Sequence, residues 1–516
     1  MKVLLISPHP DILAFGIRSI SAYIKKTGKA DAHLMFLPYM HRDLSAEPDF
    51  RFPYPEAILN QVAGIAKEYD LIGISLMTNY FQRARQLTRA IRAATEAPIL
   101  WGGIHPTVAP RECAEWADYI VKGEGERPLS LILEKYGKAE PLQDVPNLAV
   151  KTPEGLRENP LDPLLPIEEI PGPDWDWKGH YILWQEQVQP MTLPVLKAFL
   201  SDNVAARQTG MIVYQTMATR GCPHGCAYCC NYVLRRLYEG QKWVRRRPLG
   251  DLIAELQWVK ENMPFVKIID FQDDSFSAGS EEEIEEFTKA YKEKIDLPFT
   301  LHVSPLTISP KKMDDMTNAG LMGVVMGIQT GSEKTLSLYG RPIFKDKTIS
   351  AAGLLKKYRH RIGAPFYDII VDNPLEGDED LLKTLRLLLQ LPRPFRLRLF
   401  SLVLFPGTTL HKEAEKQGLI HDPENQIYKK HYHVRKDSYY KFLMALLSDG
   451  WPCFLIRTAL WKPLRVLFNR PALGSFCSIA YKFALLPTRA FRLVTFILSG
   501  RWERIRARLK PRPSNL

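Results

Sequence analysis

Four cysteines lie within nine residues of one another, in the segment TRGCPHGCAYCCN that spans residues 219–231. Cys222, Cys226 and Cys229 follow a C-x3-C-x2-C pattern. Three thiolates on one short loop can each bind one iron of a four-iron cluster, which leaves the fourth iron open for a substrate. Zinc is the alternative, but a structural zinc site normally has four ligands, and Cys230 would have to be the fourth. We expect an iron-sulfur cluster, with Cys230 as a loop or packing residue.

The remaining cysteines and the first residues indicate the compartment. The chain has seven cysteines, and an odd number with four clustered does not suit a disulfide framework. The short apolar run at the start ends at residues 8–10, Pro-His-Pro, and predicts a buried strand rather than a signal peptide. No uncharged run reaches the roughly 18 apolar residues of a membrane helix. We therefore expect a cytoplasmic protein.

The net charge of +12 is concentrated in the tail, where residues 441–516 hold 14 Lys and Arg side chains against two acidic ones. A basic surplus favours an anionic partner. Residues 483–499 mix Arg with aliphatic residues, as in helices that lie in a membrane interface. We expect contact with a membrane surface and a small-molecule or lipid substrate; the alternatives are a solvated appendage and a cover for the barrel opening. No known nucleic-acid module accompanies the charge, so nucleic acid is disfavoured.

The elements that must position these residues fall into four segments. Residues 1–135 alternate short apolar runs with helical patterns, which predicts an α/β doubly wound parallel sheet. Residues 136–206 are rich in Pro and acidic residues and predict a surface linker. Residues 207–415 hold about six strand–helix units, which predict a partial (β/α)6 barrel with its chemistry at the carboxyl ends of the strands. Residues 416–516 predict a helical, basic region.

Six strands and four helices are expected in the barrel segment. The strands are 213–218, 267–271, 300–303, 323–328, 364–371 and 396–402. The helices are 252–260, 281–294, 310–319 and 348–358. The cysteine segment directly follows the first strand, so it is expected in the loop at that strand's carboxyl end.

The cysteine pattern, with an aromatic residue just before its last cysteine, resembles the signature of the radical S-adenosylmethionine superfamily. The resemblance implies that the methionyl group of S-adenosylmethionine chelates the open iron. It also implies that one electron, from a donor such as flavodoxin or ferredoxin, cleaves the sulfonium to give a 5′-deoxyadenosyl radical. The segment FQDDSF, residues 271–276, resembles the family's acidic segment, so Asp273 and Asp274 are expected to receive the methionyl amine.

Three further segments resemble later motifs of the same superfamily. GIQTGSE, residues 327–333, resembles a G-I-E-S-G-S-E strand, with Gln329 where Glu is usual. DNPLEG, residues 372–377, resembles the stretch after the fifth strand, and FPGTTL, residues 405–410, resembles P-G-T-x-L after the last. The resemblance implies that Gln329, Ser332 and Asp372 contact S-adenosylmethionine.

The first segment resembles the cobalamin-binding domain that precedes many radical enzymes, through WGGIHPT at residues 101–107 and KGEGE at residues 122–126. Glycines at strand ends let the backbone approach a large flat ligand. The resemblance implies these contacts to cobalamin: Ser75, Gly102, Gly103, His105, Thr107, Gly123, Glu124 and Gly125. His9 lies where a cobalt ligand would, but the Asp and Gly of D-x-H-x-x-G are missing, so we do not expect it to bind cobalt.

Together these resemblances imply a radical enzyme with a [4Fe-4S] cluster, S-adenosylmethionine and cobalamin, which methylates an unactivated carbon. Methylcobalamin would supply the methyl group, and a second S-adenosylmethionine would restore it. The alternatives are a radical cyclase, oxidase or rearrangement enzyme without methyl transfer, and a non-catalytic metal- or cobalamin-binding protein. Methylthiotransferases are disfavoured because they carry three more cysteines in the first domain, where this chain has only Cys113.

Overall fold

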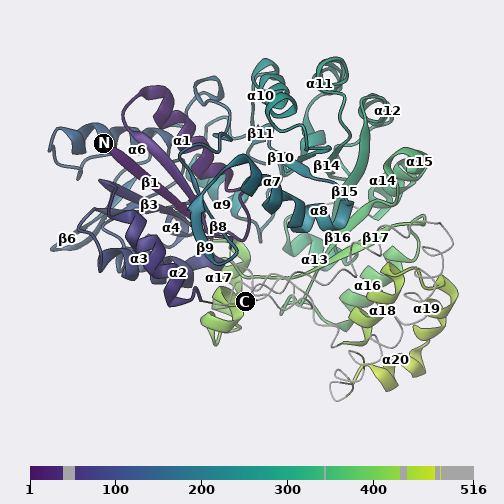
Figure 1. Ribbon diagram of the computed structural model, residues 1–516. Coiled ribbons are helices and arrows are strands. Elements are labelled where there is room, and N and C mark those ends of the chain that lie inside the picture. Colours follow the sequence, from purple (N-terminus) through teal and green to yellow (C-terminus); the bar gives the residue numbers. More distant parts are fainter. Residues whose placement is uncertain (39–52, 342–344, 431–437, 471–472, 474–476, 478–516) are drawn as a thin grey trace, which may run out of the picture.

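The computed structural model describes residues 1–38, 53–341, 345–430, 438–470, 473 and 477 (Figure 1). Two α/β units lie side by side, the N-terminal one in purple and blue and the second in teal and green, and yellow helices pack below the second unit. This order of a doubly wound sheet, a partial barrel and a helical region confirms the predicted fold class.

In the described residues the N-terminal unit is built on a nine-stranded sheet with the order β7-β6-β5-β4-β3-β1-β2-β8-β9. The five strands at its centre are parallel. Their bounds are β1 (Lys2–Ser7), β2 (Asp31–Phe36), β3 (Leu71–Ser75), β4 (Ile99–Gly102) and β5 (Tyr119–Val121). Every residue of β1 after Lys2 is buried, as expected for a parallel strand that is covered on both faces.

Helices cover both faces of this sheet. The apolar sides of α1 (Phe15–Thr27) and α6 (Glu126–Gly137) pack on one face, and those of α2 (Glu56–Ala66) and α3 (Phe81–Arg92) pack on the other. The short helices α4 (Ile104–Val108) and α5 (Pro110–Ala114) and the 3-10 turn η1 (Thr78–Tyr80) lie in the loops after β3 and β4. The loops at the carboxyl ends of the parallel strands therefore meet at one edge of the sheet.

The prediction of a surface linker over residues 136–206 is wrong, because this segment completes the N-terminal sheet. One antiparallel hairpin pairs with β5 and another continues from β2. The elements are β6 (Leu148–Thr152), β7 (Gly155–Glu158), η2 (Ile167–Glu169), β8 (Tyr181–Trp184), β9 (Gln187–Pro190), α7 (Leu193–Asp202) and α8 (Val204–Thr209). About half of the Pro and acidic residues that suggested a linker lie between the two hairpins. The β8–β9 turn also lacks the Asn-Gly pair that marks a two-residue hairpin.

That turn predicts a stabilising substitution. Gln185 and Glu186 have φ values of 52° and 66°, a left-handed conformation that costs ordinary residues about 1–2 kcal/mol each. Gln185→Asn with Glu186→Gly should raise the free energy of unfolding by about 1 kcal/mol, after the entropy that Gly adds to the unfolded chain. Thermal melts would show a higher midpoint, and Gln187→Asn in the neighbouring strand is the control. A lower midpoint for the turn variant would contradict the assignment.

The second unit contains, in the described residues, a six-stranded parallel sheet with the order β10-β13-β14-β15-β16-β17. All six predicted strands are confirmed. Their bounds are β10 (Val213–Thr216), β13 (Ile268–Phe271), β14 (Phe299–Val303), β15 (Leu321–Gln329), β16 (Phe366–Val371) and β17 (Arg396–Ser401). Within these residues β10 and β17 do not pair with each other, so the barrel is open at one side. The small ribbon of β11 (Thr219–Arg220) and β12 (Arg245–Arg246) stands at the end of β10.

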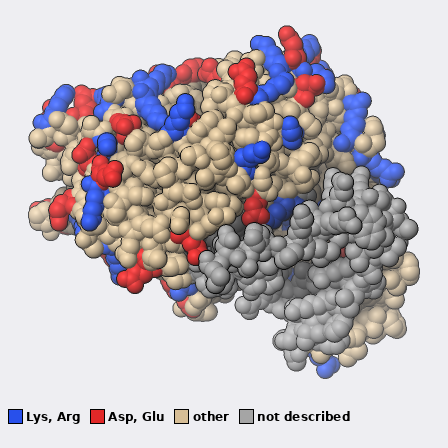
Figure 2. All heavy atoms as spheres, in the orientation of Figure 1, with Lys and Arg blue, Asp and Glu red and all other residues tan. Residues whose placement is uncertain are grey.

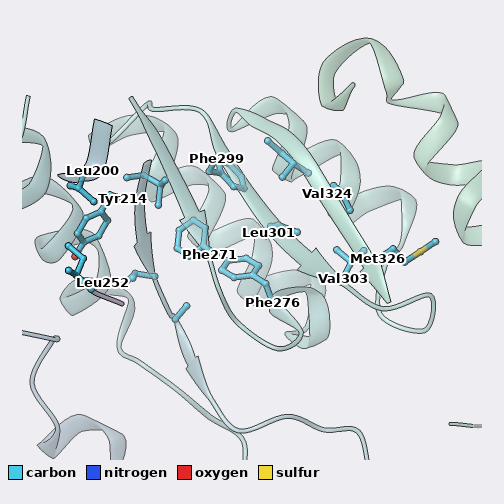
Figure 3. Packing of buried hydrophobic residues seen from close by; sticks show 14 of the residues in the cluster. Leu200, Tyr214, Leu252, Phe271, Phe276, Phe299, Leu301, Val303, Val324 and Met326 are labelled. Carbon is cyan, nitrogen blue, oxygen red and sulfur yellow. The ribbon is translucent and has the colours of Figure 1, made fainter. Parts of the chain in front are cut away.

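Helices pack on the outer side of this curved sheet. They are α10 (Leu249–Asn262), η3 (Phe276–Ala278), α11 (Glu281–Lys294), α12 (Pro310–Asn318), α13 (Glu333–Leu338), α14 (Lys345–Lys357), α15 (Arg359–Ile362) and α16 (Asp378–Leu388). Helix α9 (Cys230–Leu237) lies instead at the boundary with the N-terminal unit (Figure 1). Figure 3 shows the layer between sheet and helices, where the ring centroids of Phe271 and Phe276 lie 4.9 Å apart and those of Phe271 and Phe299 lie 5.9 Å apart. Alternate residues along each strand point instead into the barrel interior.

The C-terminal region begins with α17 (Thr409–Lys416) and the π-helical turn η4 (Glu424–Tyr428), followed by α18 (Tyr439–Ser448), α19 (Cys453–Ala459) and α20 (Lys462–Phe468). The turn η4 returns to the N-terminal unit, where Tyr428 Oη donates a 2.7 Å hydrogen bond to Glu112. The predicted interfacial helix at 483–499 lies outside the described residues. Among the residues that are described, no helix is long and apolar enough to span a membrane.

Charge on the body of the molecule is mixed. Figure 2 shows Lys and Arg interspersed with Asp and Glu over the outer helices of the second unit. Lys289 and Lys311, for example, both pair with Glu285 at 2.6 Å. Exposed pairs of this kind add little stability.

Candidate active site

The cysteine loop joins β11 to α9, at the carboxyl end of the first barrel strand. It is held by two segments that follow much later in the chain. The N–H of Ala227 donates a 2.9 Å hydrogen bond to the carbonyl of Tyr339, and the carbonyl of Ala227 accepts a 3.0 Å bond from the N–H of Leu410. Gly340 fits beside this loop because a Cβ there would lie 2.9 Å from the carbonyl oxygen of Gly225. The loop is therefore fixed by tertiary contacts.

The three thiols suit an iron-sulfur cluster. Cys222 and Cys226 are buried, Cys229 is half-buried, and none forms a disulfide. Burial raises the pKa of Cys222 to about 12, whereas a hydrogen bond with Cys230 lowers the pKa of Cys229. Within the described residues no three His, Cys, Asp or Glu side chains converge as ligands of one metal ion. A cubane cluster does not need such convergence, since each thiolate binds a separate iron.

Arg341 contacts the cysteine loop, which the sequence patterns did not reveal. Its Nη1 lies 3.5 Å from Cys226 Sγ, and its Nη2 donates a 3.1 Å hydrogen bond to the carbonyl of Gly327. The side chain is buried at 8% exposure. A buried guanidinium beside a thiolate stabilises the negative charge that a metal ligand must carry. No local motif indicates this contact, because Arg341 follows a strand three units after the cysteine loop.

The acidic pair after β13 is divided between two environments. Asp273 is fully buried, and its Oδ2 accepts a 2.9 Å hydrogen bond from the N–H of Ala218, so it braces the chain between β10 and the cysteine loop. Asp274 is exposed and accepts a 2.8 Å hydrogen bond from Asn231, at the start of α9. Asp274 is thus the carboxylate that faces open space beside the cysteines.

The buried carboxyl of Asp273 should make the free energy of unfolding depend on pH. Burial raises its pKa from 3.8 to about 6 against the opposing effects of the Ala218 N–H and Arg246, with Asp274 adding to the rise. Folding therefore takes up a proton between about pH 4 and pH 6. The free energy of unfolding falls as the pH rises through that window. Asp273→Asn should be more stable than wild type by about 1–2 kcal/mol at pH 8, since its amide nitrogen lacks a partner and offsets part of the gain.

The advantage of Asp273→Asn should shrink as the pH falls from 6 to 4, and thermal melts across pH 4–8 would follow it. Asp251→Asn is the control, because that carboxylate is exposed at the start of α10. An advantage that grows on acidification would contradict the assignment.

The other predicted contacts to S-adenosylmethionine differ in placement. Gln329 is the last residue of β15 and Asp372 directly follows β16, and both have left-handed backbones with φ values of 72° and 58°. Such strain in non-glycine residues collects at functional sites. Asp372 Oδ1 lies 2.5 Å from Lys441 Nζ of α18, a contact that no sequence motif indicates. Ser332 is not brought to the opening: it is fully buried, begins α13 and donates a 2.6 Å hydrogen bond to Asp380.

A cavity of about 340 Å³ lies between the N-terminal sheet and the second unit. Apolar side chains such as Leu5, Ile17 and Leu129 form its walls, and Met217 and Tyr238 close it from the barrel side. Seven of the eight predicted cobalamin contacts line it: Ser75, Gly102, Gly103, Thr107, Gly123, Glu124 and Gly125. An apolar space with a few polar groups is typical of a cofactor site.

The eighth predicted contact, His105, does not line the cavity. It is fully buried on α4, its Nδ1 lies 3.2 Å from Thr78 Oγ1, and its Nε2 lies 3.5 Å from Glu112. Its ring packs against Phe81 and Tyr428. His105 therefore joins α4 to the returning turn η4.

Glycines shape the cavity in two ways. A Cβ at Gly123, where φ is +71°, would lie 2.0 Å from Tyr238 Oη, so this glycine permits contact between the two units. A Cβ at Gly102 would find its nearest atoms at 3.8 Å, so this position has room for a side chain in the cavity. The residues present thus fit a bulky cofactor that approaches the backbone closely.

Comparison with known proteins matches both units. Residues 216–388 match the family model of the radical SAM superfamily, and residues 1–133 match that of the B12 binding domain. An uncharacterized methyltransferase of Pyrococcus horikoshii is 26% identical over 371 residues, which are 70% of this chain and 73% of the relative.

Solved structures show the same fold. The radical S-adenosylmethionine methyltransferase TsrM of Kitasatospora setae, solved with cobalamin and a [4Fe-4S] cluster, has a TM-score of 0.60 at 17% identity, covering 81% of this chain and 75% of its own. The cobalamin-dependent radical enzyme OxsB has a TM-score of 0.63 at 14% identity, covering 97% and 75%. The chain therefore combines a B12 binding domain, over residues 1–133, with a domain of the radical SAM superfamily, over residues 216–388.

Proposed function

We propose that this chain is a cobalamin-dependent radical S-adenosylmethionine methyltransferase that acts on an unactivated carbon of a small molecule. The observation that carries the proposal is the cavity beside the cysteine loop. Arg220, two residues before Cys222, lines the same cavity as Gly102 and Gly123 of the B12-binding unit. Two sites for cofactors therefore adjoin. The printed names of the Pyrococcus relative and of TsrM, both methyltransferases, support the same reaction class.

The chain's own residues would hold the reactants. A [4Fe-4S] cluster on Cys222, Cys226 and Cys229 would supply the electron that cleaves S-adenosylmethionine, and cobalamin in the cavity would supply the methyl group. Asp274 would pair with the methionyl amine, since it is the exposed carboxylate next to the cysteines. Gln329 and Asp372, at neighbouring strand ends, would hydrogen-bond the rest of that molecule. These roles are part of the proposal.

The barrel interior favours a polar substrate over a lipid. Asp270 accepts hydrogen bonds from Gln215 at 2.9 Å and Thr300 at 2.6 Å. Arg398 makes two bonds with Asp368, at 2.6 and 2.7 Å. A barrel interior that serves only as a packed core is filled by branched apolar residues, whereas these half-buried polar groups can bind a hydrogen-bonding molecule.

The experiment uses anaerobic protein reconstituted with iron, sulfide and hydroxocobalamin, a chemical reductant, and S-adenosylmethionine with a deuterated methyl group. Candidate small molecules are screened by mass spectrometry. Transfer of the deuterated methyl group to carbon supports the proposal. Release of 5′-deoxyadenosine with a product that carries no label would favour a cyclase, oxidase or rearrangement enzyme. Bound cofactors without any 5′-deoxyadenosine would favour a non-catalytic binding protein.

A further inference from the structure

Two arginines of the radical unit and two glutamates of the B12-binding unit form a cluster of ion pairs at the cavity wall. Arg220 and Arg245 are paired across β11 and β12. Arg220 Nη2 lies 2.5 Å from Glu126 Oε1, and Arg220 Nη1 lies 3.2 Å from Glu124 Oε1. Arg245 also pairs with Glu124. We call these four side chains the Arg–Glu cluster.

The Arg–Glu cluster is largely buried. Glu126 is 2% exposed and accepts a further 2.8 Å hydrogen bond from Ser19. Burial by itself would raise the pKa of Glu126, but the charge of Arg220 and its hydrogen bond outweigh this effect and hold the pKa below its ordinary value. A buried ion pair adds little net stability compared with apolar packing, yet a change to one partner is costly. The cluster therefore favours one relative placement of the two units.

The Arg–Glu cluster joins the cysteine loop to the segment of the B12-binding unit that lines the cavity. Arg220 stands two residues before Cys222, and Glu124 and Glu126 belong to the loop and helix start that line the cavity. A second link runs from the other end of the cysteine loop: the N–H of Glu124 donates a 3.0 Å hydrogen bond to Tyr238 Oη, at the end of α9. The cavity loop is thus tied to the chain on both sides of the cysteines.

We propose that Arg220 and Glu126 are positioning residues, which set the distance and orientation between the cobalamin in the cavity and the iron-sulfur cluster. The inference rests on the proposed function, since it concerns the same two cofactors. A misplacement of reacting groups by about 1 Å can lower a rate by about 100-fold. A methyltransferase that uses both cofactors on one substrate would therefore depend on this placement, although neither residue is a cluster ligand.

The test measures the interaction between the cofactors in the full-length holoenzyme. Cob(II)alamin and the reduced cluster are both paramagnetic, and their magnetic interaction, seen by electron paramagnetic resonance, depends steeply on their separation and orientation. Glu126→Gln and Arg220→Met remove one charge each, and Arg220→Lys keeps it. We expect the first two variants to retain iron and cobalamin at wild-type levels but to show an altered spin–spin splitting. Arg220→Lys should preserve the wild-type splitting.

Asp118→Asn is the control. It breaks a pair with Arg92 at 2.5 Å that lies within the B12-binding unit, and neither residue lines the cavity. This variant should keep the wild-type splitting. An unchanged splitting in both Glu126→Gln and Arg220→Met would overturn this inference but leave the proposed function standing. Loss of either cofactor from these variants would also overturn it, because the residues would then be needed for binding.

Two checks keep the result decisive. Circular dichroism and a thermal melt establish folding, and if Glu126→Gln does not fold, the comparison of Arg220→Met with Arg220→Lys decides. A wild-type protein that binds iron but no cobalamin would overturn the proposed function, and the inference with it. That outcome is recognised in the unmutated protein before any variant is compared.

Discussion

Replacement of Cys222, Cys226 or Cys229 by Ala should remove the iron-sulfur cluster from the protein. Each thiolate binds a separate iron, so no neighbouring ligand compensates for a lost one. Iron content should fall from about four atoms per chain to near zero, and formation of 5′-deoxyadenosine should become undetectable. Iron and sulfide analysis, with the visible absorption of the reconstituted protein, measures the first effect, and chromatography of the reaction mixture measures the second.

Cys230→Ala is the control for these variants. Cys230 is half-buried, directly follows Cys229 and begins α9, and adjacent side chains seldom reach the same cluster. This variant should keep its iron and its activity. Retention of the cluster by Cys229→Ala together with its loss from Cys230→Ala would show that the third ligand has been misassigned. If the protein bound zinc through these cysteines and no iron, the assignment of an iron-sulfur cluster would be wrong.

Gly102→Leu should weaken the binding of cobalamin while the rest of the protein stays intact. The position is not left-handed, and a Cβ there meets Val121 only at 3.8 Å, so the backbone accepts a side chain. The added atoms must point into the cavity and occupy space that the ligand needs. Overpacking of this kind costs about 1–3 kcal/mol, which corresponds to about a 5- to 150-fold weaker affinity. Titration with hydroxocobalamin, followed by its visible spectrum, measures the change.

Gly353→Leu in α14 serves as the comparison, because a Cβ there has no atoms within 4 Å and Gly353 does not line the cavity. It should bind cobalamin like the wild type. Both variants should retain the iron-sulfur cluster, since neither touches the cysteine loop. Wild-type affinity in Gly102→Leu would place the cofactor elsewhere.

The sequence predicted those helices and strands that a short stretch of residues indicates by itself. Helix α11 has the predicted bounds, Glu281–Lys294, because Ser280 and Glu283 form a capping box at its start. Strands such as β13 stand out as apolar runs between helices. The β8–β9 hairpin was missed because its turn uses Gln185 and Glu186 rather than Asn-Gly.

The site was predictable where a resemblance covered consecutive residues, as for the cysteine loop and the glycine loops that line the cavity. Residues that act across long sequence separations were not. Arg341 approaches Cys226 and Lys441 approaches Asp372 only once the chain has folded. His105 belonged to a recognised motif, yet its side chain faces away from the cavity because α4 turns it towards Phe81. Side-chain direction depends on tertiary packing, which consecutive residues do not encode.

The hydrogen bonds that hold the cysteine loop also bear on when the protein can acquire its metal during synthesis. Ala227 is bound by Tyr339 and by Leu410, and both lie far downstream, so they leave the ribosome long after the cysteines do. Until then the three thiols stand on an unsupported loop beside Cys230, where oxidation to a disulfide competes with iron capture. A cell that makes this chain should therefore load the cluster after translation of the barrel has finished, and expression that outpaces iron delivery should yield protein with oxidised cysteines.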